Sequence, residues 1–126
     1  MSSAAESLLN RPLSQATLAF VDVETTGLDP GRGDRVCEIA VIRQEPGGLE
    51  REFVSFIDPE MEISPGAFAV NKITPEMLAG APRFLDLIDR IDDLISDAVM
   101  VAHNARFDVG FLRAEYARCG RAFPEL

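Results

Sequence analysis

The spacing of hydrophobic residues changes along the chain, and each change predicts a different element. Residues 18–21 form a continuous apolar run within a strand predicted at residues 17–23, as in central strands that are buried on both faces. Valine and isoleucine predict a second strand at residues 35–43. A turn over residues 45–48, with two glycines, predicts that a third strand at residues 50–57 returns antiparallel to the second.

Beyond residue 58 the pattern is first irregular and then helical. Thr74 followed by Pro75 provides the N-cap and the first residue of a helix. A helix at residues 83–96 and another from residue 104 or 105 to residue 119, ended by Gly120, enclose a short buried strand at residues 99–102. The apolar face of the first of these helices consists of Phe84, Leu87, Ile88, Ile91, Leu94 and Ile95. This order of elements predicts an α/β domain with a mixed sheet flanked by helices.

The size and charge of the chain limit its organisation and its partners. Its 126 residues suffice for one domain, which we expect at residues 15–126 after a flexible tail at residues 1–14. Twelve basic residues against 21 acidic ones, a net charge of −9, exclude a broad nucleic-acid footprint, because such binding neutralises many phosphates. A nucleic-acid substrate would therefore be gripped over a short stretch or held by a partner.

The sequence gives no support to a membrane segment or a disulfide framework. No apolar run has the length of a membrane span, and residues 1–10 lack the basic start and apolar core of a secretory signal. Cys37 and Cys119 are far apart and outside any CxxC pattern, which also leaves a zinc site unsupported. We expect a cytoplasmic protein in which both thiols are reduced.

Two acids near the end of the first predicted strand are the strongest candidates for chemistry. Asp22 and Glu24 alternate along the strand and therefore point to the same side. Acids at the end of an apolar strand are costly unless compensated, and Mg²⁺ or Mn²⁺, which prefer carboxylate oxygen, would compensate them. The alternative is that the strand simply emerges into solvent. The following Thr25-Thr26-Gly27 favours a site, since a tight glycine turn lets backbone N–H groups approach a phosphate or sugar.

A third acid, Asp108, falls in the first turn of the last predicted helix, just after the short strand. The helix dipole alone favours a carboxylate at this position. However, the junction between a central strand and a helix is also where α/β sheets build sites. Asp108 is thus placed to complete a three-carboxylate cluster with Asp22 and Glu24.

Two motifs resemble those of one enzyme family. Residues 20–28, Phe-Val-Asp-Val-Glu-Thr-Thr-Gly-Leu, resemble the first motif of the DEDD (DnaQ-like) 3′–5′ exonucleases, and residues 102–108, Ala-His-Asn-Ala-Arg-Phe-Asp, resemble the second. Residues 33–41 resemble the family's second strand. Residues 63–82 resemble its linking segment, except that Asn71-Lys72 replaces the usual His-Gly. The resemblance spans residues 18–120 and implies an RNase H-like fold.

Carried over by motif, the resemblance implies hydrolysis of terminal phosphodiester bonds with two ions of Mg²⁺ or Mn²⁺, which releases nucleoside monophosphates from a 3′ end. It implies that Asp22, Glu24 and Asp108 are the metal ligands. The residues that it places around the last nucleotide are Thr25, Thr26, Gly27, Leu28, Asn104 and Phe107. The apolar neighbours of Phe107 favour a different interpretation, as a core residue. The implied partners are a single-stranded 3′ end of DNA or RNA and a DNA polymerase subunit.

The family's third motif, His-x4-Asp, supplies a general base and the last metal ligand. His103 and Asp108 have this spacing, but the residues around them match the second motif instead. The sequence therefore predicts that residues 15–126 are the N-terminal part of an RNase H-like exonuclease domain, whose final strand and helix are absent. It also predicts little or no activity from the chain alone, since a general base contributes about 10²–10⁴-fold. Two alternatives stay open: an interaction module of the same fold, and a haloacid-dehalogenase-type phosphatase, which Glu24 disfavours because that class needs Asp in its place.

Overall fold

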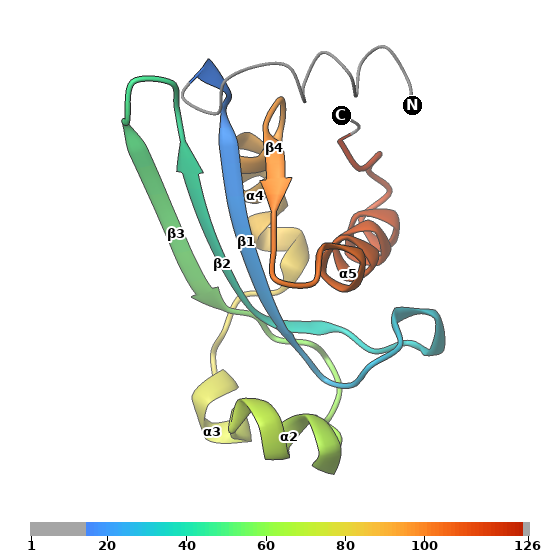
Figure 1. Cartoon of the computed structure of the whole chain (residues 1–126). Helices are drawn as coiled ribbons and strands as arrows, with labels where there is room; N and C mark the ends of the chain where they lie inside the picture. The colour runs from blue at the N-terminus through green and yellow to red at the C-terminus, as the bar shows by residue number, and fades with distance from the viewer. Residues whose placement is uncertain (1–14, 125–126) are drawn as a thin grey trace.

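The computed structural model describes residues 15–124, which form a four-stranded sheet with two longer helices on one face (Figure 1). The tail predicted at residues 1–14 lies outside the described residues. None of the described helices is long and apolar enough to cross a bilayer. In chain order the elements are β1 (Leu18–Thr25), the 3-10 turn η2 (Pro30–Arg32), β2 (Val36–Gln44), β3 (Glu50–Phe56), α2 (Pro65–Asn71), α3 (Pro75–Leu78), α4 (Phe84–Ile95), β4 (Val99–Val101) and α5 (Ala105–Arg118).

The strands lie in the order β3-β2-β1-β4. β1 pairs antiparallel with β2, β2 pairs antiparallel with β3, and β1 pairs parallel with β4. The predicted mixed sheet, with three antiparallel strands and then a parallel one, is confirmed. The parallel pairing ends where Phe20 lies opposite Val101. The chain leaves β4 there, so that α5 begins beside the second half of β1.

The core lies between the sheet and the helices α4 and α5. Helix α4 packs on β2, and α5 packs on β1 and β2. The predicted apolar face of α4 is confirmed, since the helix buries Phe84, Ile88, Ile91, Leu94 and Ile95. Each large apolar side chain removed from water contributes about 1.5–3 kcal/mol. This stripe is therefore the main attachment of α4 to the sheet.

The other face of the sheet is open in residues 15–124, and two predictions about it are wrong. β1 is not buried on both faces, because Phe20 is 39% exposed and Asp22 is exposed as well. β4 is partly exposed rather than buried. A continuous apolar run indicates burial on both faces only where both faces are covered, and here the described helices cover one.

The segment that was predicted to be irregular contains the helix α2. Ser64 is its N-cap, with a side chain that accepts a hydrogen bond from the Ala67 N–H, and Pro65 is its first residue. Thr74 and Pro75 begin α3 in the same way, as predicted. The dipeptide Ser64-Pro65 was therefore the signal for the helix that the prediction missed.

Candidate active site

Asp22 and Glu24 lie on the open face of β1, as their alternation predicts. Asp22 is exposed and Glu24 is half-buried. The register of β1 against β2 places Glu38 directly opposite Glu24. Like charges in directly opposite positions of a sheet are destabilising, by an amount on the order of 0.2–1 kcal/mol. This pair is therefore unfavourable unless a cation lies near it.

Asp108 approaches these acids from the first turn of α5. Its side chain is 5% exposed. Its Oδ2 accepts a hydrogen bond of 3.1 Å from the N–H of Val23, the residue between Asp22 and Glu24. The three predicted metal ligands therefore converge on one part of β1, and one carboxylate oxygen of Asp108 also braces α5 against the strand.

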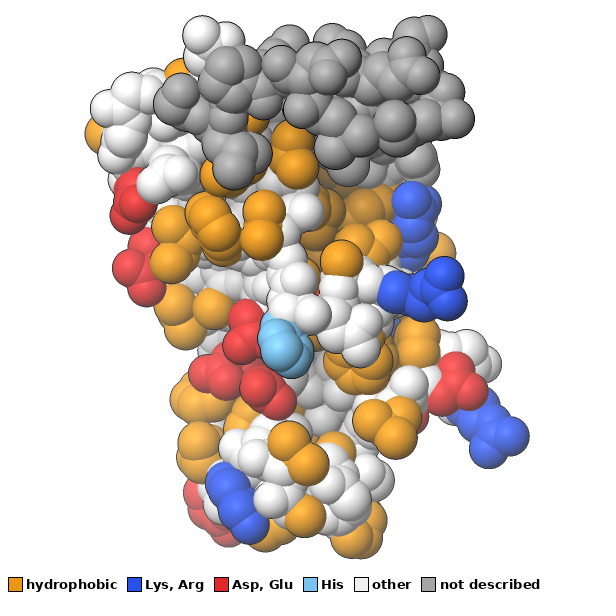
Figure 2. All heavy atoms as spheres, viewed as in Figure 1, with side chains coloured by type: hydrophobic (Ala, Val, Ile, Leu, Met, Phe, Trp, Pro, Cys, Tyr) orange, Lys and Arg blue, Asp and Glu red, His pale blue; other side chains and the backbone are white. Residues whose placement is uncertain are grey.

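The carboxylates of this cluster repel one another. Burial raises the pKa of Glu24 above its ordinary value, and the negative charges of nearby acids, Asp22, Glu38 and Asp108, raise it further. Burial also raises the pKa of Asp108, against the Val23 N–H, which lowers it. None of the ion pairs within residues 15–124 involves these acids. Figure 2 shows acidic side chains gathered beside the single histidine, with no basic side chain among them.

Two further residues lie at this cluster: Glu38, which sequence reasoning missed, and His103, which it assigned to the second motif without a catalytic role. His103 lines the same shallow hollow of the open face as Asp22, and its positive charge would lower the pKa of Asp108. The signal for Glu38 was a single acid in the otherwise apolar stretch of residues 36–42. Nothing in the sequence showed that its strand partner would be Glu24.

The turn after β1 is closed by its own hydroxyl and backbone groups. Thr25 Oγ1 donates to the Gly27 carbonyl at 2.7 Å, and Thr26 Oγ1 accepts from the Arg35 N–H at 3.0 Å. Both threonines are buried, so their hydroxyls face inward. Among the described residues, the N–H groups of Gly27 and Leu28 make no hydrogen bond; Gly27 is buried and Leu28 is exposed.

Gly27 is required by the space around it. A Cβ at this position would lie 2.3 Å from Asp34 Oδ2. The Asp34 carboxylate holds the loop, because it accepts hydrogen bonds from Thr26 Oγ1 and from the Asp29 N–H, both at 3.1 Å. Only glycine allows the turn and this carboxylate to lie so close together.

Helix α2 is attached to the same turn. Asn71 Nδ2 donates to the Thr25 carbonyl at 3.1 Å, and the Ser64 N–H donates to the Thr26 carbonyl at 2.8 Å. Asn71 stands where the family pattern has histidine, and its amide connects the end of α2 with the end of β1.

The remaining predicted substrate contacts have separate positions. Leu28 projects from the turn with 84% of its surface exposed. Asn104 caps α5, since its Oδ1 accepts from the Phe107 N–H at 3.5 Å. Phe107 is half-buried and packs on Phe111, with ring centroids 4.9 Å apart. This packing supports its interpretation as a core residue.

Asp22, Glu24 and Asp108 offer only carboxylate oxygens, which are the ligand atoms that hard divalent cations prefer. Within residues 15–124, no three His, Cys, Asp or Glu side chains are gathered into an arrangement that holds an ion as it stands. Asp22 is exposed and Glu24 half-exposed, so both side chains have room to turn toward an ion beside Asp108.

An acidic cluster on the open face of this mixed sheet is the arrangement of an RNase H-like nuclease domain. The model of the RNase T exonuclease family matches residues 19–126, and the chain therefore belongs to that family. It is an exonuclease domain of the DnaQ type, and exonucleases of this kind generally use divalent metal ions. The match overturns the alternative of a haloacid-dehalogenase-type phosphatase.

Relatives and solved structures agree with this assignment. The chain is 35% identical over 111 residues to DNA polymerase III PolC-type from Staphylococcus haemolyticus, covering 88% of this chain and 8% of that protein. It is 40% identical over 98 residues to DNA polymerase III subunit epsilon from Treponema pallidum, covering 78% and 45%. A product-bound exonuclease I superposes with a TM-score of 0.75 at 26% identity, covering 86% of this chain and 27% of that one. The chain thus spans less than half the length of these relatives.

Proposed function

We propose that the chain acts in 3′–5′ exonucleolytic hydrolysis of single-stranded DNA with two divalent ions. The observation that carries this proposal is the convergence of Asp22, Glu24 and Asp108 without a basic partner. Such a cluster is unfavourable by itself and becomes favourable when cations bind. Membership of the exonuclease family supports phosphodiester hydrolysis as the reaction.

In this proposal Asp22, Glu24 and Asp108 hold the ions, Mg²⁺ or Mn²⁺. When bound, the ions supply an activated water and neutralise charge on the scissile phosphate. Asp108 is fixed by its hydrogen bond to Val23 and offers its other oxygen, Oδ1. Asp22 and Glu24 complete the site from the strand.

The turn at residues 25–28 would hold the terminal nucleotide. In this proposal the N–H group of Leu28 donates to a phosphate or sugar oxygen, and the exposed Leu28 side chain lies against the base. Thr25 and Thr26 do not contact the nucleotide; their hydrogen bonds within the chain fix the shape of the turn. They are positioning residues in this proposal, since their hydroxyls are used within the chain.

None of the 126 residues matches the third motif, which would provide the general base of the reaction. Their single histidine, His103, is exposed and belongs to the second motif. Because a general base contributes about 10²–10⁴-fold to the rate, we expect little or no turnover from these residues alone.

DNA and a polymerase subunit are the proposed partners. Two of the relatives are DNA polymerase III proteins, and a solved E. coli exonuclease I with a TM-score of 0.73 is in complex with a dT13 oligonucleotide. The net charge of −9 supports a short grip on one 3′ end, with a partner that holds the rest of the substrate.

Metal binding is tested by thermal unfolding of the chain in Mn²⁺ and in EDTA at neutral pH. Binding at a concentration of 100 Kd stabilises a protein by about 2.7 kcal/mol, which raises the Tm by several degrees. Asp22→Asn and Asp108→Asn should each remove most of this rise, whereas the control His103→Ala should keep it. A rise that survives both carboxylate variants would show that the ion binds elsewhere.

Substrate polarity is tested with a 5′-labelled oligothymidylate that ends in a free 3′-OH or in a 3′-phosphate. We expect Mn²⁺-dependent binding that prefers the free 3′ end and is lost in Asp22→Asn, and any slow product should be a series of 5′-labelled strands shortened by one nucleotide at a time from the 3′ end. No preference for a free end would favour the interaction module instead. Rapid turnover abolished by Asp22→Ala would support the function and refute the expected inactivity.

A further inference from the structure

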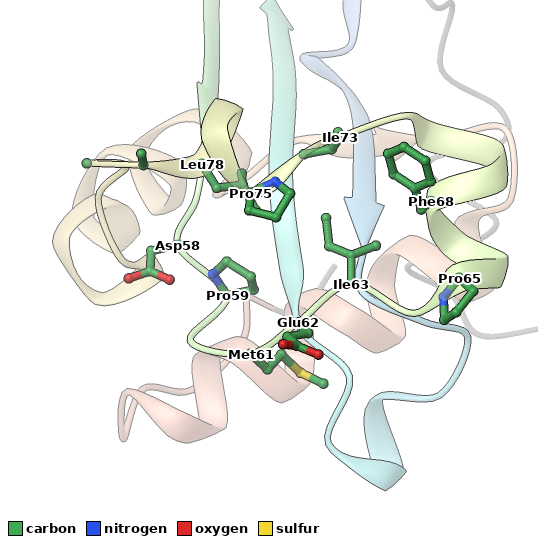
Figure 3. Close-up of a pocket in the computed structure, with 12 residues that line it drawn as sticks. Asp58, Pro59, Met61, Glu62, Ile63, Pro65, Phe68, Ile73, Pro75 and Leu78 are labelled. Atoms are coloured by element: carbon green, nitrogen blue, oxygen red, sulfur yellow. The ribbon is translucent and has the colours of Figure 1, made fainter.

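A second hollow, the α2–α3 groove, lies between the end of β3 and the short helices α2 and α3. It has a volume of about 800 Å³ and shares no residue with the carboxylate cluster. Figure 3 shows the side chains of Ile63, Phe68 and Pro75 around a common space, with the carboxylates of Asp58 and Glu62 at its edge.

The α2–α3 groove is an exposed apolar surface and not part of the core. Met61 and Phe68 are 42% and 41% exposed, and neither α2 nor α3 contains a buried residue. Contiguous apolar surface left in water marks interaction sites, and methionine adapts its shape to a partner. The groove therefore has the surface of a docking site.

The side chains that line the groove restrict what can bind there. None of the 12 lining residues has a side-chain hydrogen-bond donor, and the two charged ones, Asp58 and Glu62, are acids. Residues 58–80 carry four acidic residues and one basic residue. That base, Lys72, lies over the Phe68 ring at 5.8 Å and does not line the groove. A phosphate or sugar would find repulsion and no side-chain donor, so nucleic acid is a poor occupant.

We propose that the α2–α3 groove docks a basic, amphipathic segment of a partner protein. A large apolar side chain of that segment fills the groove, and its Arg or Lys residues face Asp58 and Glu62. Helices that bind in grooves present apolar anchors with flanking charges in this way. A second copy of this chain is a poor occupant, because it is itself acidic, with a net charge of −9.

The groove is joined to the turn at residues 25–28, which directly follows Asp22 and Glu24 of the candidate active site. Met61 Sδ lies 3.3 Å from Thr26 Oγ1, and Asn71 at the end of α2 donates to the Thr25 carbonyl. A docked partner would therefore hold α2 against this turn without entering the carboxylate cluster. The proposal does not rest on the exonuclease reaction, since no groove residue is among the proposed metal ligands.

The experiment is a selection of displayed random peptides on the immobilised chain in EDTA, followed by measurement of Kd for the enriched peptides. We expect peptides that combine a large apolar residue with Arg or Lys. Phe68→Ser and Glu62→Lys should each weaken them by about tenfold or more, as truncation of an interface anchor does. The matched controls Val54→Ser and Glu52→Lys, exposed on β3, should change the Kd less than about twofold.

Circular dichroism of each variant separates loss of binding from loss of folding, and Glu62→Lys carries the test if Phe68→Ser does not fold. The proposal is overturned if no peptide is enriched, if the enriched peptides are acidic, or if the groove variants and the controls weaken binding equally. Self-association that Phe68→Ser abolishes would identify a second copy as the occupant and would also overturn it. Direct binding of oligothymidylate to the chain that Phe68→Ser abolishes would identify nucleic acid as the occupant and would also overturn the proposal.

Discussion

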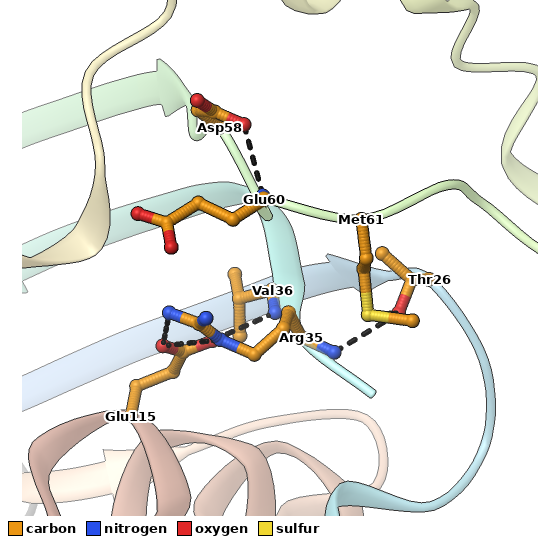
Figure 4. A network of polar contacts seen from close by, with 7 residues as sticks. All are labelled: Thr26, Arg35, Val36, Asp58, Glu60, Met61 and Glu115. Atoms are coloured by element: carbon orange, nitrogen blue, oxygen red, sulfur yellow. Dashed lines mark hydrogen bonds and ion pairs between the residues drawn. The ribbon is translucent and has the colours of Figure 1, made fainter. Parts of the chain in front are cut away.

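Glu115 in α5 gives the sharpest prediction about stability, because both of its carboxylate oxygens are used in the core. It is 1% exposed. Its oxygens accept from Arg35 Nη2 at 2.7 Å, from Arg35 Nε at 3.0 and 3.1 Å, and from the Val36 N–H at 3.0 Å (Figure 4). The Arg35 N–H in turn donates to Thr26 Oγ1. One carboxylate thus connects α5, the start of β2 and the turn of the candidate active site.

The cost of removing Glu115 follows from what it would leave behind. Glu115→Ala leaves the Arg35 guanidinium, whose side chain is 15% exposed, without its counter-charge. Breaking a buried ion pair on one side costs about 3–5 kcal/mol. Replacing both partners, as Arg35→Met with Glu115→Leu, removes the buried charge and leaves the Val36 N–H unpaired, which costs about 1–3 kcal/mol. The double variant should therefore be more stable than Glu115→Ala alone.

The assay is urea unfolding followed by circular dichroism in EDTA, together with the Tm. At about 3–6 °C per kcal/mol for a domain of this size, Glu115→Ala should lower the Tm by roughly 10 °C or more. The matched control is Asp89→Ala, which breaks the ion pair with Arg121. The Asp89 side chain is 91% exposed, and such a pair contributes at most about 1 kcal/mol. The reasoning is refuted if Glu115→Ala costs no more than Asp89→Ala, or if the double variant is the less stable one.

Three further predictions concern the turn, the cluster and the thiols. Gly27→Ala should lower the free energy of unfolding in urea by about 1–3 kcal/mol, because the added Cβ clashes with Asp34. The same substitution should cost less in an Asp34→Ala background, and equal costs in both backgrounds would contradict the clash. In EDTA, Glu24→Gln should gain stability over the parent chain as the pH rises from about 4 to about 8. A carboxyl group whose pKa is raised on folding destabilises the fold once it ionises. If the difference in Tm between Glu24→Gln and the parent chain stays constant with pH, Glu24 is not repelled by the acids around it. Burial raises the pKa of the Cys37 thiol to about 12, so a thiol reagent should modify only Cys119 in the folded chain and both cysteines after unfolding; rapid labelling of Cys37, read by mass spectrometry, is the contrary result.

The elements that the sequence predicted well are those whose signal is local. The apolar stripe of α4 and the cap at Thr74 depend on residues within a few positions of one another, and the structure has both. The burial of β1 was predicted wrongly, because exposure depends on what covers each face of the sheet. Phe20 belongs to a fully apolar run and still lies on the open face.

The candidate site was predictable where its residues lie on one strand or in one motif. The alternation of Asp22 and Glu24 places both on one face whatever the rest of the fold. Glu38 was not predictable, because its position opposite Glu24 depends on the register between two strands. The inward direction of the Thr26 hydroxyl likewise depends on Arg35, nine positions away across the loop.

A comparison of the two buried carboxylates of α5, Asp108 and Glu115, supports the proposal that the carboxylate cluster binds a cation. Asp108 and Glu115 lie two turns apart on the same face of the helix, and each accepts a hydrogen bond from a backbone N–H of the sheet. Glu115 also has the guanidinium of Arg35, so its charge is neutralised within the fold. Asp108 is in none of the ion pairs of the described residues, and, besides burial, the charge of Asp22 raises its pKa more than the charge of His103 lowers it. Bracing the helix accounts for Glu115 completely, whereas at Asp108 it leaves a buried negative charge uncompensated. Groups that break the local rules of stability in this way are expected where a protein binds or reacts, and in the proposed function a divalent cation would supply the charge that is absent.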